Sequence, residues 1–398
     1  MKGSLKSKAH TRRLLFSLVA LAVVAAVAYA AGRPALLAEV ESRFNHTLTP
    51  GSIAVSDTAQ RLHEEALIVD LHADSLLWGR DLLERSEQGH VDVPRLRRGG
   101  VALQVFGLVT QSPDGQNYDR NAADSDRIRM LVMATGWPPW TWNNYHRRAL
   151  HQLGRLAETV KNSDGALRWI ESRRDLQELV AARRAGAAEI GVFGGLEGAH
   201  AAANVKELKE LHSAGLRMLG LAHFIDNPLA GSAHGVDKYG LTEEGRVVVR
   251  EAQRLGIVVD LAHASKRTVR DVLELATRPV VVSHGGVRGT CPGSRTLSDS
   301  QLRGIAATGG VVGIGFFEGA VCGSDVPSIV RAIRYAIRVA GADHVALGSD
   351  FDGSVTTPFD ASGLPVLTEA LLESGLPAET VRKVLGENAL RVFSEALP

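Results

Sequence analysis

Six short apolar segments of this chain each end on a residue that can bind a metal ion or carry a proton. They span residues 68–74, 191–197, 218–223, 257–263, 280–284 and 345–350, and their polar ends are His72 with Asp74, Glu197, His223, His263, His284 and Asp350. Short uninterrupted apolar runs are typical of strands that are buried on both faces of a parallel sheet. A His, Asp or Glu at the end of each of six such strands predicts a metal-dependent site at one edge of that sheet.

The residue types at these strand ends favour zinc. His72 and Asp74 are two residues apart in an extended strand, so both side chains point to the same side and can bind one ion. His263 and His284 end later strands, and Glu197 is flanked by glycines and small residues that leave room for ions. Imidazoles and carboxylates without thiolates suit Zn²⁺ or a similar borderline divalent ion. Five ligands exceed one tetrahedral site. If Glu197 bridges, the count predicts two zinc ions per chain, which can hold a bridging hydroxide and polarise a substrate carbonyl.

The elements that position these residues form a regular pattern. Two further apolar runs, residues 102–109 and 311–316, lack the polar end and bring the number of predicted strands to eight. Helical patterns alternate with the strands, which predicts an α/β fold, a (β/α)₈ TIM barrel of the metal-dependent hydrolase type, over residues 61–398. Residues 137–142 hold three tryptophans and two prolines within a helical pattern. They predict either a lid-like element or a packed surface corner.

The first 31 residues do not belong to the barrel. Five lysines and arginines precede an apolar run from Leu14 to Ala31. This composition predicts one N-terminal hydrophobic helix that acts as a signal peptide or as an uncleaved signal anchor. Either way we expect an exported protein with the barrel on the outer side of the membrane, either anchored there or secreted. Residues 32–60 are predicted to form a linker and a first helix.

Composition argues against a nucleic-acid partner and allows one disulfide bond. The net charge is +1, and no basic stripe interleaved with aromatic residues is present, so nucleic acid is not an expected partner. The chain has two cysteines, Cys291 and Cys322, in loops that follow neighbouring strands on the same barrel face. Export would make a disulfide between them reasonable, whereas a cytosolic chain would carry them as buried thiols.

Several motifs together resemble one enzyme family. They are DLHAD at 70–74, LEGAH at 196–200, LAH at 221–223, DLAHAS at 260–265, SH at 283–284, SR at 294–295, GSDFDG at 348–353 and GENALRV at 386–392. The chain resembles the membrane dipeptidase (renal dipeptidase) family of zinc peptidases, which is part of the amidohydrolase-like barrels. The resemblance runs from about Leu67 to Phe393. It implies hydrolysis of dipeptides, often with a D-residue at the C-terminal position, and in some members the opening of penem-type β-lactams.

The resemblance also implies a role for each strand-end residue. His72 and Asp74 would hold one zinc ion, His263 and His284 the other, and Glu197 would bridge the two.

Three residues would then handle the substrate. His223 would contact the developing oxyanion, Arg295 would bind the substrate carboxylate, and Asp350 would transfer protons. Asp352 would support these residues without contacting the substrate or the metal. Many relatives have Asn after the arginine where this chain has Thr296.

The preferred hypothesis is a dinuclear zinc dipeptidase that acts on small peptide substrates. The family resemblance also implies that the protein is a homodimer. The same barrel acting on a β-lactam, a lactone or a tailored peptide intermediate is an alternative. An inactive, membrane-tethered binding barrel is a third hypothesis, but it would be expected to have lost a ligand, and none of the five is missing.

Overall fold

The computed structural model describes residue 32, residues 37–48 and residues 54–398. The predicted signal peptide or anchor, residues 1–31, lies outside the described residues, and its predicted helix is not tested. Within the described part of the chain, no helix has both the length and the apolar character needed to cross a bilayer. Residues 37–41 are helical, and α2 (Asp57–Glu65) runs across the predicted boundary at residue 60.

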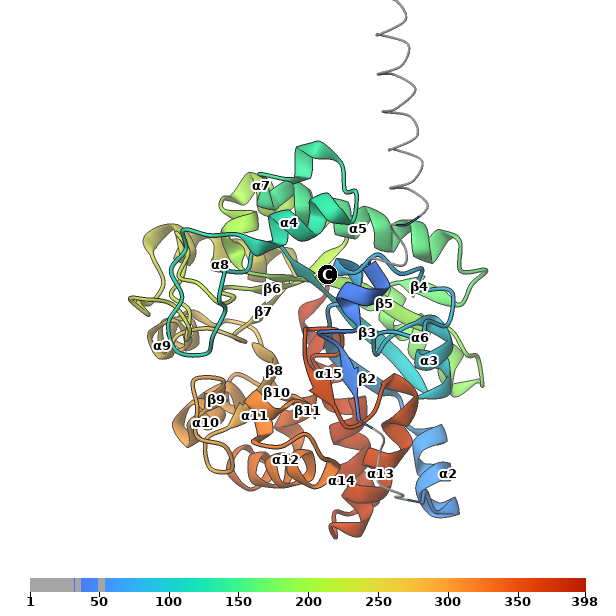
Figure 1. Ribbon diagram of the computed structural model, residues 1–398. Helices are drawn as coiled ribbons and strands as arrows, with labels where there is room; N and C mark the ends of the chain where they lie inside the picture. Colours follow the sequence, from blue (N-terminus) through green and yellow to red (C-terminus); the bar gives the residue numbers. More distant parts are fainter. Residues whose placement is uncertain (1–31, 33–36, 49–53) are drawn as a thin grey trace, which may run out of the picture.

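Eight parallel strands form a closed barrel, which confirms the predicted (β/α)₈ architecture. Each strand pairs with the next, and β8 pairs with β10 and β11 with β2 to close the ring. All eight overlap the apolar runs predicted from sequence, and they gather at the centre of the molecule (Figure 1). Three of them, β6, β7 and β11, end three residues earlier than predicted, so His223, His263 and Asp350 lie in the loops that follow. They are β2 (Ile68–Ala73), β3 (Val101–Val109), β5 (Ile190–Glu197), β6 (Leu216–Gly220), β7 (Val258–Asp260), β8 (Val281–Val287), β10 (Val311–Ile314) and β11 (Val345–Leu347).

Helices surround the barrel and follow the predicted order. Many begin at a Ser, Thr, Asp or Asn whose side chain accepts a hydrogen bond from the first turn, as Ser172 does in a capping box with Asp175. The helices are α3 (Val93–Arg98), α4 (Arg127–Ala134), α5 (Tyr145–Lys161), α6 (Arg173–Arg184), α7 (Val205–Ser213), α8 (Glu243–Leu255), α9 (Lys266–Leu275), α10 (Asp299–Ala307), α11 (Glu318–Val321), α12 (Val326–Ala340), α13 (Leu364–Glu373), α14 (Ala378–Arg382) and α15 (Asn388–Ala396).

The interior of the barrel is filled by side chains and closed at one end by α15. Val69, Phe193 and Val281 belong to a buried cluster that also contains Val392 and Phe393 of this helix. The rings of Phe193 and Phe393 meet edge to face with centroids 5.0 Å apart. Because the end near α15 is packed shut, ligands can enter only from the other end, where the strands finish.

Several short pairings add to the predicted barrel. β4 (Leu167–Trp169) pairs with the first residues of β5, and β9 (Thr296–Leu297) pairs with the end of β8. β1 (His46–Thr47) pairs with β12 (Thr356–Thr357). Strands of two or three residues carry no readable periodicity, so sequence patterns do not predict them. A π-helical turn, Lys383–Glu387, connects α14 to α15.

The tryptophan-rich stretch forms a packed corner. Trp137 is buried in a small cluster with Trp78 and Val132, and the Trp142 indole donates a hydrogen bond to the Trp137 carbonyl. Trp140 remains 61% exposed. Of the two predicted alternatives, the structure has the corner.

Candidate active site

Side chains from four strand ends converge on one oxygen of Glu197 at the mouth of the barrel. The Glu197 Oε1 atom lies 3.5 Å from His72 Nε2 and 3.4 Å from the Nε2 atoms of both His263 and His284. All four residues are buried. The structure therefore brings together residues that are as far apart as 72 and 284 in the chain, as the strand-end pattern predicts.

The spacing between these atoms matches that of ligands around zinc. Neighbouring ligands of a tetrahedral zinc ion lie about 3.3 Å apart, given metal–ligand distances of about 2.0 Å. His263 Nε2 and His284 Nε2 are 3.0 Å apart, and His72 Nε2 is 3.1 Å from Asp74 Oδ1. Each of these two pairs adjoins Glu197. Three overlapping groups of buried side chains have ligand atoms close enough to hold a metal ion: His72, Glu197 and His284; Glu197, His223 and His263; and His72, Asp74 and Asp350.

Orphaned polar atoms show that the residues present fit a cation. His72 Nε2, Asp74 Oδ1 and Glu197 Oε1 are buried and have no hydrogen-bond partner. Leaving such atoms unsatisfied costs free energy, and a metal ion would satisfy all three. Burial opposes charge on His72, yet the carboxylates of Asp74 and Glu197 outweigh it and raise the pKa of His72 to about 10. The surroundings of His72 thus favour positive charge.

The other two imidazoles are suited to bind metal as neutral ligands. Burial, together with the positive charge of Arg295, lowers the pKa of His263 well below its ordinary value. Burial, followed by the charge on His72, does the same for His284. A neutral imidazole keeps a free lone pair, which is the form that coordinates metal.

Hydrogen bonds fix which nitrogen of His284 faces the site. Ser283 Oγ donates to Asp260 Oδ2 at 2.5 Å, so it accepts from His284 Nδ1 at 2.8 Å. This arrangement places the ring proton on Nδ1 and leaves Nε2 free to coordinate. A metal-binding histidine is commonly oriented in this way by a group behind it.

Irregular backbone aims several of these side chains into the mouth. In β2, Val69 and Leu71 pack inside the barrel, and a register irregularity lies between Asp70 and Ala73, just where His72 turns to the site. His263 and Asp350 have backbone φ angles of 60° and 63°, which residues other than glycine rarely adopt. Such strain persists where surrounding contacts impose it, often at functional sites.

Gly107 of β3 provides the space for one pair of ligands. A Cβ atom at this position would lie 2.0 Å from Asp74 Oδ1 and 2.8 Å from His72 Cε1. Only glycine lets both ligands reach their places. The strand-end pattern does not point to Gly107, because the second predicted strand lacks a polar end.

His223 faces Glu197 from the opposite side. Its Nδ1 atom donates to the Gln111 carbonyl at 2.9 Å, and its Nε2 atom lies 3.1 Å from Glu197 Oε2. Burial lowers the pKa of His223 to about 4, so the resting ring is neutral and presents an Nε2 lone pair. His223 can therefore donate a hydrogen bond from Nε2 only after it takes up a proton.

Arg295 lines a cavity together with Glu197, His223 and Asp350, and it is 7% exposed. Its Nε atom has no hydrogen-bond partner, and its guanidinium lies over the Phe317 ring, 5.6 Å from the centroid. Thr296 Oγ1 donates to the Gly293 carbonyl at 3.0 Å within the loop that carries Arg295. A disulfide joins Cys291 of this loop to Cys322 at the end of α11.

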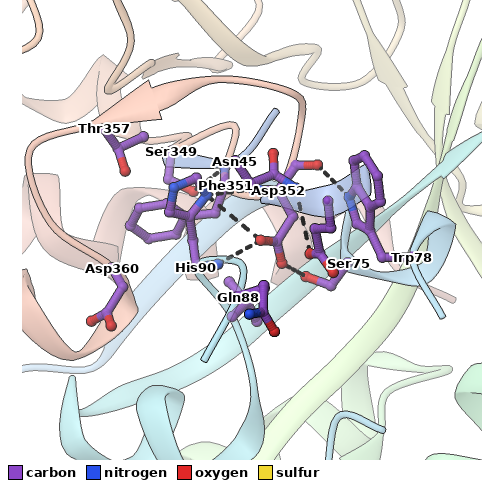
Figure 2. A network of polar contacts seen from close by, with 12 residues as sticks. Asn45, Ser75, Trp78, Gln88, His90, Ser349, Phe351, Asp352, Thr357 and Asp360 are labelled. Atoms are coloured by element: carbon purple, nitrogen blue, oxygen red, sulfur yellow. Dashed lines mark hydrogen bonds and ion pairs between the residues drawn. The ribbon is translucent and has the colours of Figure 1, made fainter. Parts of the chain in front are cut away.

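A buried network supports the loop that follows β11. Figure 2 shows Asp352 at its centre, where it accepts from Ser75 Oγ at 2.5 Å and from the His90 amide at 2.6 Å. The Asp352 carbonyl accepts from the Trp78 indole at 2.8 Å. Burial opposes charge on this carboxyl, but Arg80, which also donates to it, acts together with His90 and Ser75 to keep the pKa of Asp352 below its ordinary value. The network anchors the turn next to Asp350, so Asp352 supports the site from behind.

Asp350 itself lies at the edge of the ligand cluster. Its Oδ1 atom is 3.9 Å from His72 Nε2. Burial raises the pKa of Asp350 to about 7. A carboxyl whose pKa lies near neutrality can both accept and release a proton.

Two histidines outside the strand ends also lie close to the site. His90 is fully buried and belongs to the Asp352 network. His234 is buried with its ring centroid 5.3 Å from that of His263, and it stacks on Phe224. Neither follows a strand directly, so no pattern in the sequence connects them to the site.

A closed (β/α)₈ barrel with imidazoles and carboxylates converging at its strand ends defines a metal-dependent hydrolase. A family model described as membrane dipeptidase, peptidase family M19, matches residues 56–397. The chain therefore belongs to the membrane dipeptidase family and is a metallo-dipeptidase of this class, which confirms the resemblance seen in its motifs.

Individual relatives agree with this assignment. An uncharacterized dipeptidase of Schizosaccharomyces pombe is 30% identical over 326 residues, which cover 78% of this chain and 73% of the relative. The crystal structure of dipeptidase AC, a metallopeptidase of family M19, is 25% identical with a TM-score of 0.67, covering 84% of this chain and 99% of that one. A metallopeptidase from Rhodobacter sphaeroides, liganded with a phosphinate mimic of the dipeptide L-Ala-D-Ala, shares the fold at 24% identity. Its TM-score is 0.67, and the match covers 83% of this chain and 99% of that one.

Replacing Gly107 with alanine should displace the His72–Asp74 pair while leaving the barrel folded. We expect Gly107→Ala to weaken zinc binding by about 10–100-fold, which is typical when groups that orient metal ligands are disturbed. Competition with a zinc-binding dye would measure this. Gly154→Ala is the matched control, because nothing lies within 4 Å of the added Cβ in α5. Equal zinc affinity of the two variants would contradict the crowding argument.

Proposed function

We propose that this chain is a dinuclear zinc dipeptidase that hydrolyses the peptide bond of dipeptides, including those with a D-residue at the C-terminal position. The observation that carries the proposal is the convergence of three imidazole Nε2 atoms on Glu197 Oε1, with Asp74 beside them. His72 and Asp74 would hold one ion, His263 and His284 the other, with Glu197 shared. When bound, the two zinc ions would polarise the scissile carbonyl and lower the pKa of an attacking water.

Arg295 would bind and orient the substrate through its terminal carboxylate. A guanidinium matches a carboxylate with two parallel hydrogen bonds, and Arg295 has a buried Nε atom that lacks a hydrogen-bond partner among the described residues. Arg295 and Glu197 line the same cavity. A carboxylate held by Arg295 would therefore direct the neighbouring peptide bond toward the ligand cluster.

Asp350 and His223 would manage protons and charge around the scissile bond. Asp350, near His72, would accept a proton from the attacking water and deliver it to the leaving amine. His223, held by Gln111 and close to Glu197, would take up a proton from solvent as negative charge develops on the carbonyl oxygen, and would donate a hydrogen bond from Nε2 to that oxygen. It would return the proton to solvent when the tetrahedral intermediate collapses. Both side chains lie in the cavity that Arg295 lines.

We further propose that the barrel is exported, either anchored or secreted. The basic leader and apolar run at residues 2–31 support this, and so does the disulfide between Cys291 and Cys322, because disulfides persist in oxidising compartments. A phosphatase reporter that is active only after export, fused at the C-terminus, should be active. A fusion active only as a cytoplasmic reporter would contradict export.

Removing the guanidinium should weaken binding of dipeptides that have a free carboxyl end. For Arg295→Ala we expect KM to rise by roughly ten- to a hundredfold, as a lost charge-assisted hydrogen bond worth about 1.5–3 kcal/mol implies. Steady-state kinetics on L,L and L,D dipeptides, with amide-blocked forms for comparison, would measure it. Discrimination against the blocked forms should also flatten. If KM were unchanged on every dipeptide cleaved, a β-lactam or lactone substrate would be favoured instead.

Removing the proton acceptor should slow the chemical step without emptying the site. Asp350→Asn keeps the size of the side chain, so we expect kcat to fall by roughly 10²–10⁴ while the zinc content stays at the wild-type value. Turnover at saturating substrate and metal analysis of the same preparation would test this together. Wild-type kcat in this variant would assign the proton transfer to another group.

A further inference from the structure

A second cavity adjoins the ligand cluster and is large enough to hold part of a substrate. Its volume is about 720 Å³, and it lies between the loop after β7, the end of β8 and the loop that leads into β9. His263, His284 and Arg295 form its inner wall, so it opens directly onto the proposed metal centre. Cavities of this size typically bind small molecules.

The lining of this cavity is strongly basic. Its cations outnumber the single carboxylate, which belongs to Asp237, and they are Lys238, Lys266, Arg267, Arg288 and Arg295. None of the five has an ion-pair partner among the described residues. Arg288 and Lys238 donate only to backbone carbonyls, those of Gly293 and Asp119. The charge of Arg295 also acts on Glu197 and Asp350. The other four cations therefore keep a charge that no direct ion pair within the described part of the chain neutralises.

Two further features indicate that the groove binds an anionic ligand. Arg295 is 7% exposed, and its Nε atom has no hydrogen-bond partner although it lines the cavity. Lys266 and Arg267 form the first turn of α9, where the helix dipole is also positive. Placing cations at the positive end of a helix destabilises the free protein, and an anion bound nearby would relieve the repulsion.

We propose that this basic groove selects dipeptides whose C-terminal residue has an acidic side chain. This inference rests on the proposed function, in which Arg295 takes the terminal carboxylate of the substrate. The remainder of the C-terminal residue then extends into the groove, where Lys266, Arg267 and Arg288 surround a second negative charge. The substrate class is therefore dipeptides that end in Asp or Glu, in either stereochemical form.

The pair Ala-Glu and Ala-Gln tests this with the full-length, zinc-loaded chain. The two substrates have nearly the same shape and differ by one negative charge. We expect kcat/KM to be about tenfold higher for Ala-Glu, because two or three partly exposed charge pairs each add a modest gain. The advantage should shrink as salt is raised, since partly exposed charges are screened. The same comparison with Ala-D-Glu and Ala-D-Gln covers the other stereochemistry.

Variants locate the preference in the groove. In Lys266→Met combined with Arg267→Met, the Glu-to-Gln ratio should fall toward one. Arg270→Met is the matched control, because Arg270 lies on the same helix, is exposed and does not line the cavity. Its ratio should equal that of the wild type. Because each ratio is measured within one protein, a change in folding or zinc content cancels.

The outcomes separate the two proposals. An acidic preference that the double variant loses and Arg270→Met keeps would support the groove as a specificity site. If Ala-Glu and Ala-Gln are cleaved equally well, or if Ala-Gln is preferred, the inference is overturned while the dipeptidase function stands. If none of the four dipeptides is cleaved, the proposed function fails and the inference fails with it.

Discussion

The charge balance around Glu197 is the constraint on which the rest of the structure depends. Burial raises the pKa of Glu197 well above its ordinary value, and the nearby carboxylates of Asp74 and Asp350 raise it further. Burying one carboxylate costs several kcal/mol unless opposite charge compensates it, and three lie together here. The protonated form of His72 supplies one positive charge. Binding divalent cations would remove both the repulsion between the carboxylates and the unsatisfied atoms.

Hydrogen bonds from residues behind the site hold the members of this cluster in place. Asp260 and Ser283 set the tautomer of His284, and the Asp352 network anchors the turn beside Asp350. Residues 37–48 contribute to the same network, since Arg80 donates to both Glu41 and Asp352. The loops that face the substrate are thus tied to rigid strands and to the segment that precedes the barrel. Preorganised ligands lose little freedom when an ion binds.

Much of this architecture could be predicted from the sequence because each buried strand is a single apolar run, and six of the eight runs stop at a polar residue. The barrel and the convergence of His72, Glu197, His263 and His284 follow from that pattern. The finer arrangement depends on contacts between strands that are distant in sequence. Gly107 is needed only because Asp74 lies opposite it. His and Asp adopt left-handed backbone more often than most residues but still seldom, so residue type alone does not predict it at His263 and Asp350. The chain order likewise gives no sign that His90 and Asp352 meet.

Crystallography of the zinc-loaded full-length chain, with data collected at the zinc absorption edge, tests the central claim most directly. The account predicts two anomalous peaks about 3.5–4 Å apart, one beside His72 and Asp74 and the other beside His263 and His284, with the Glu197 carboxylate between them. A single peak at saturating zinc, or two peaks that do not share Glu197, would contradict it.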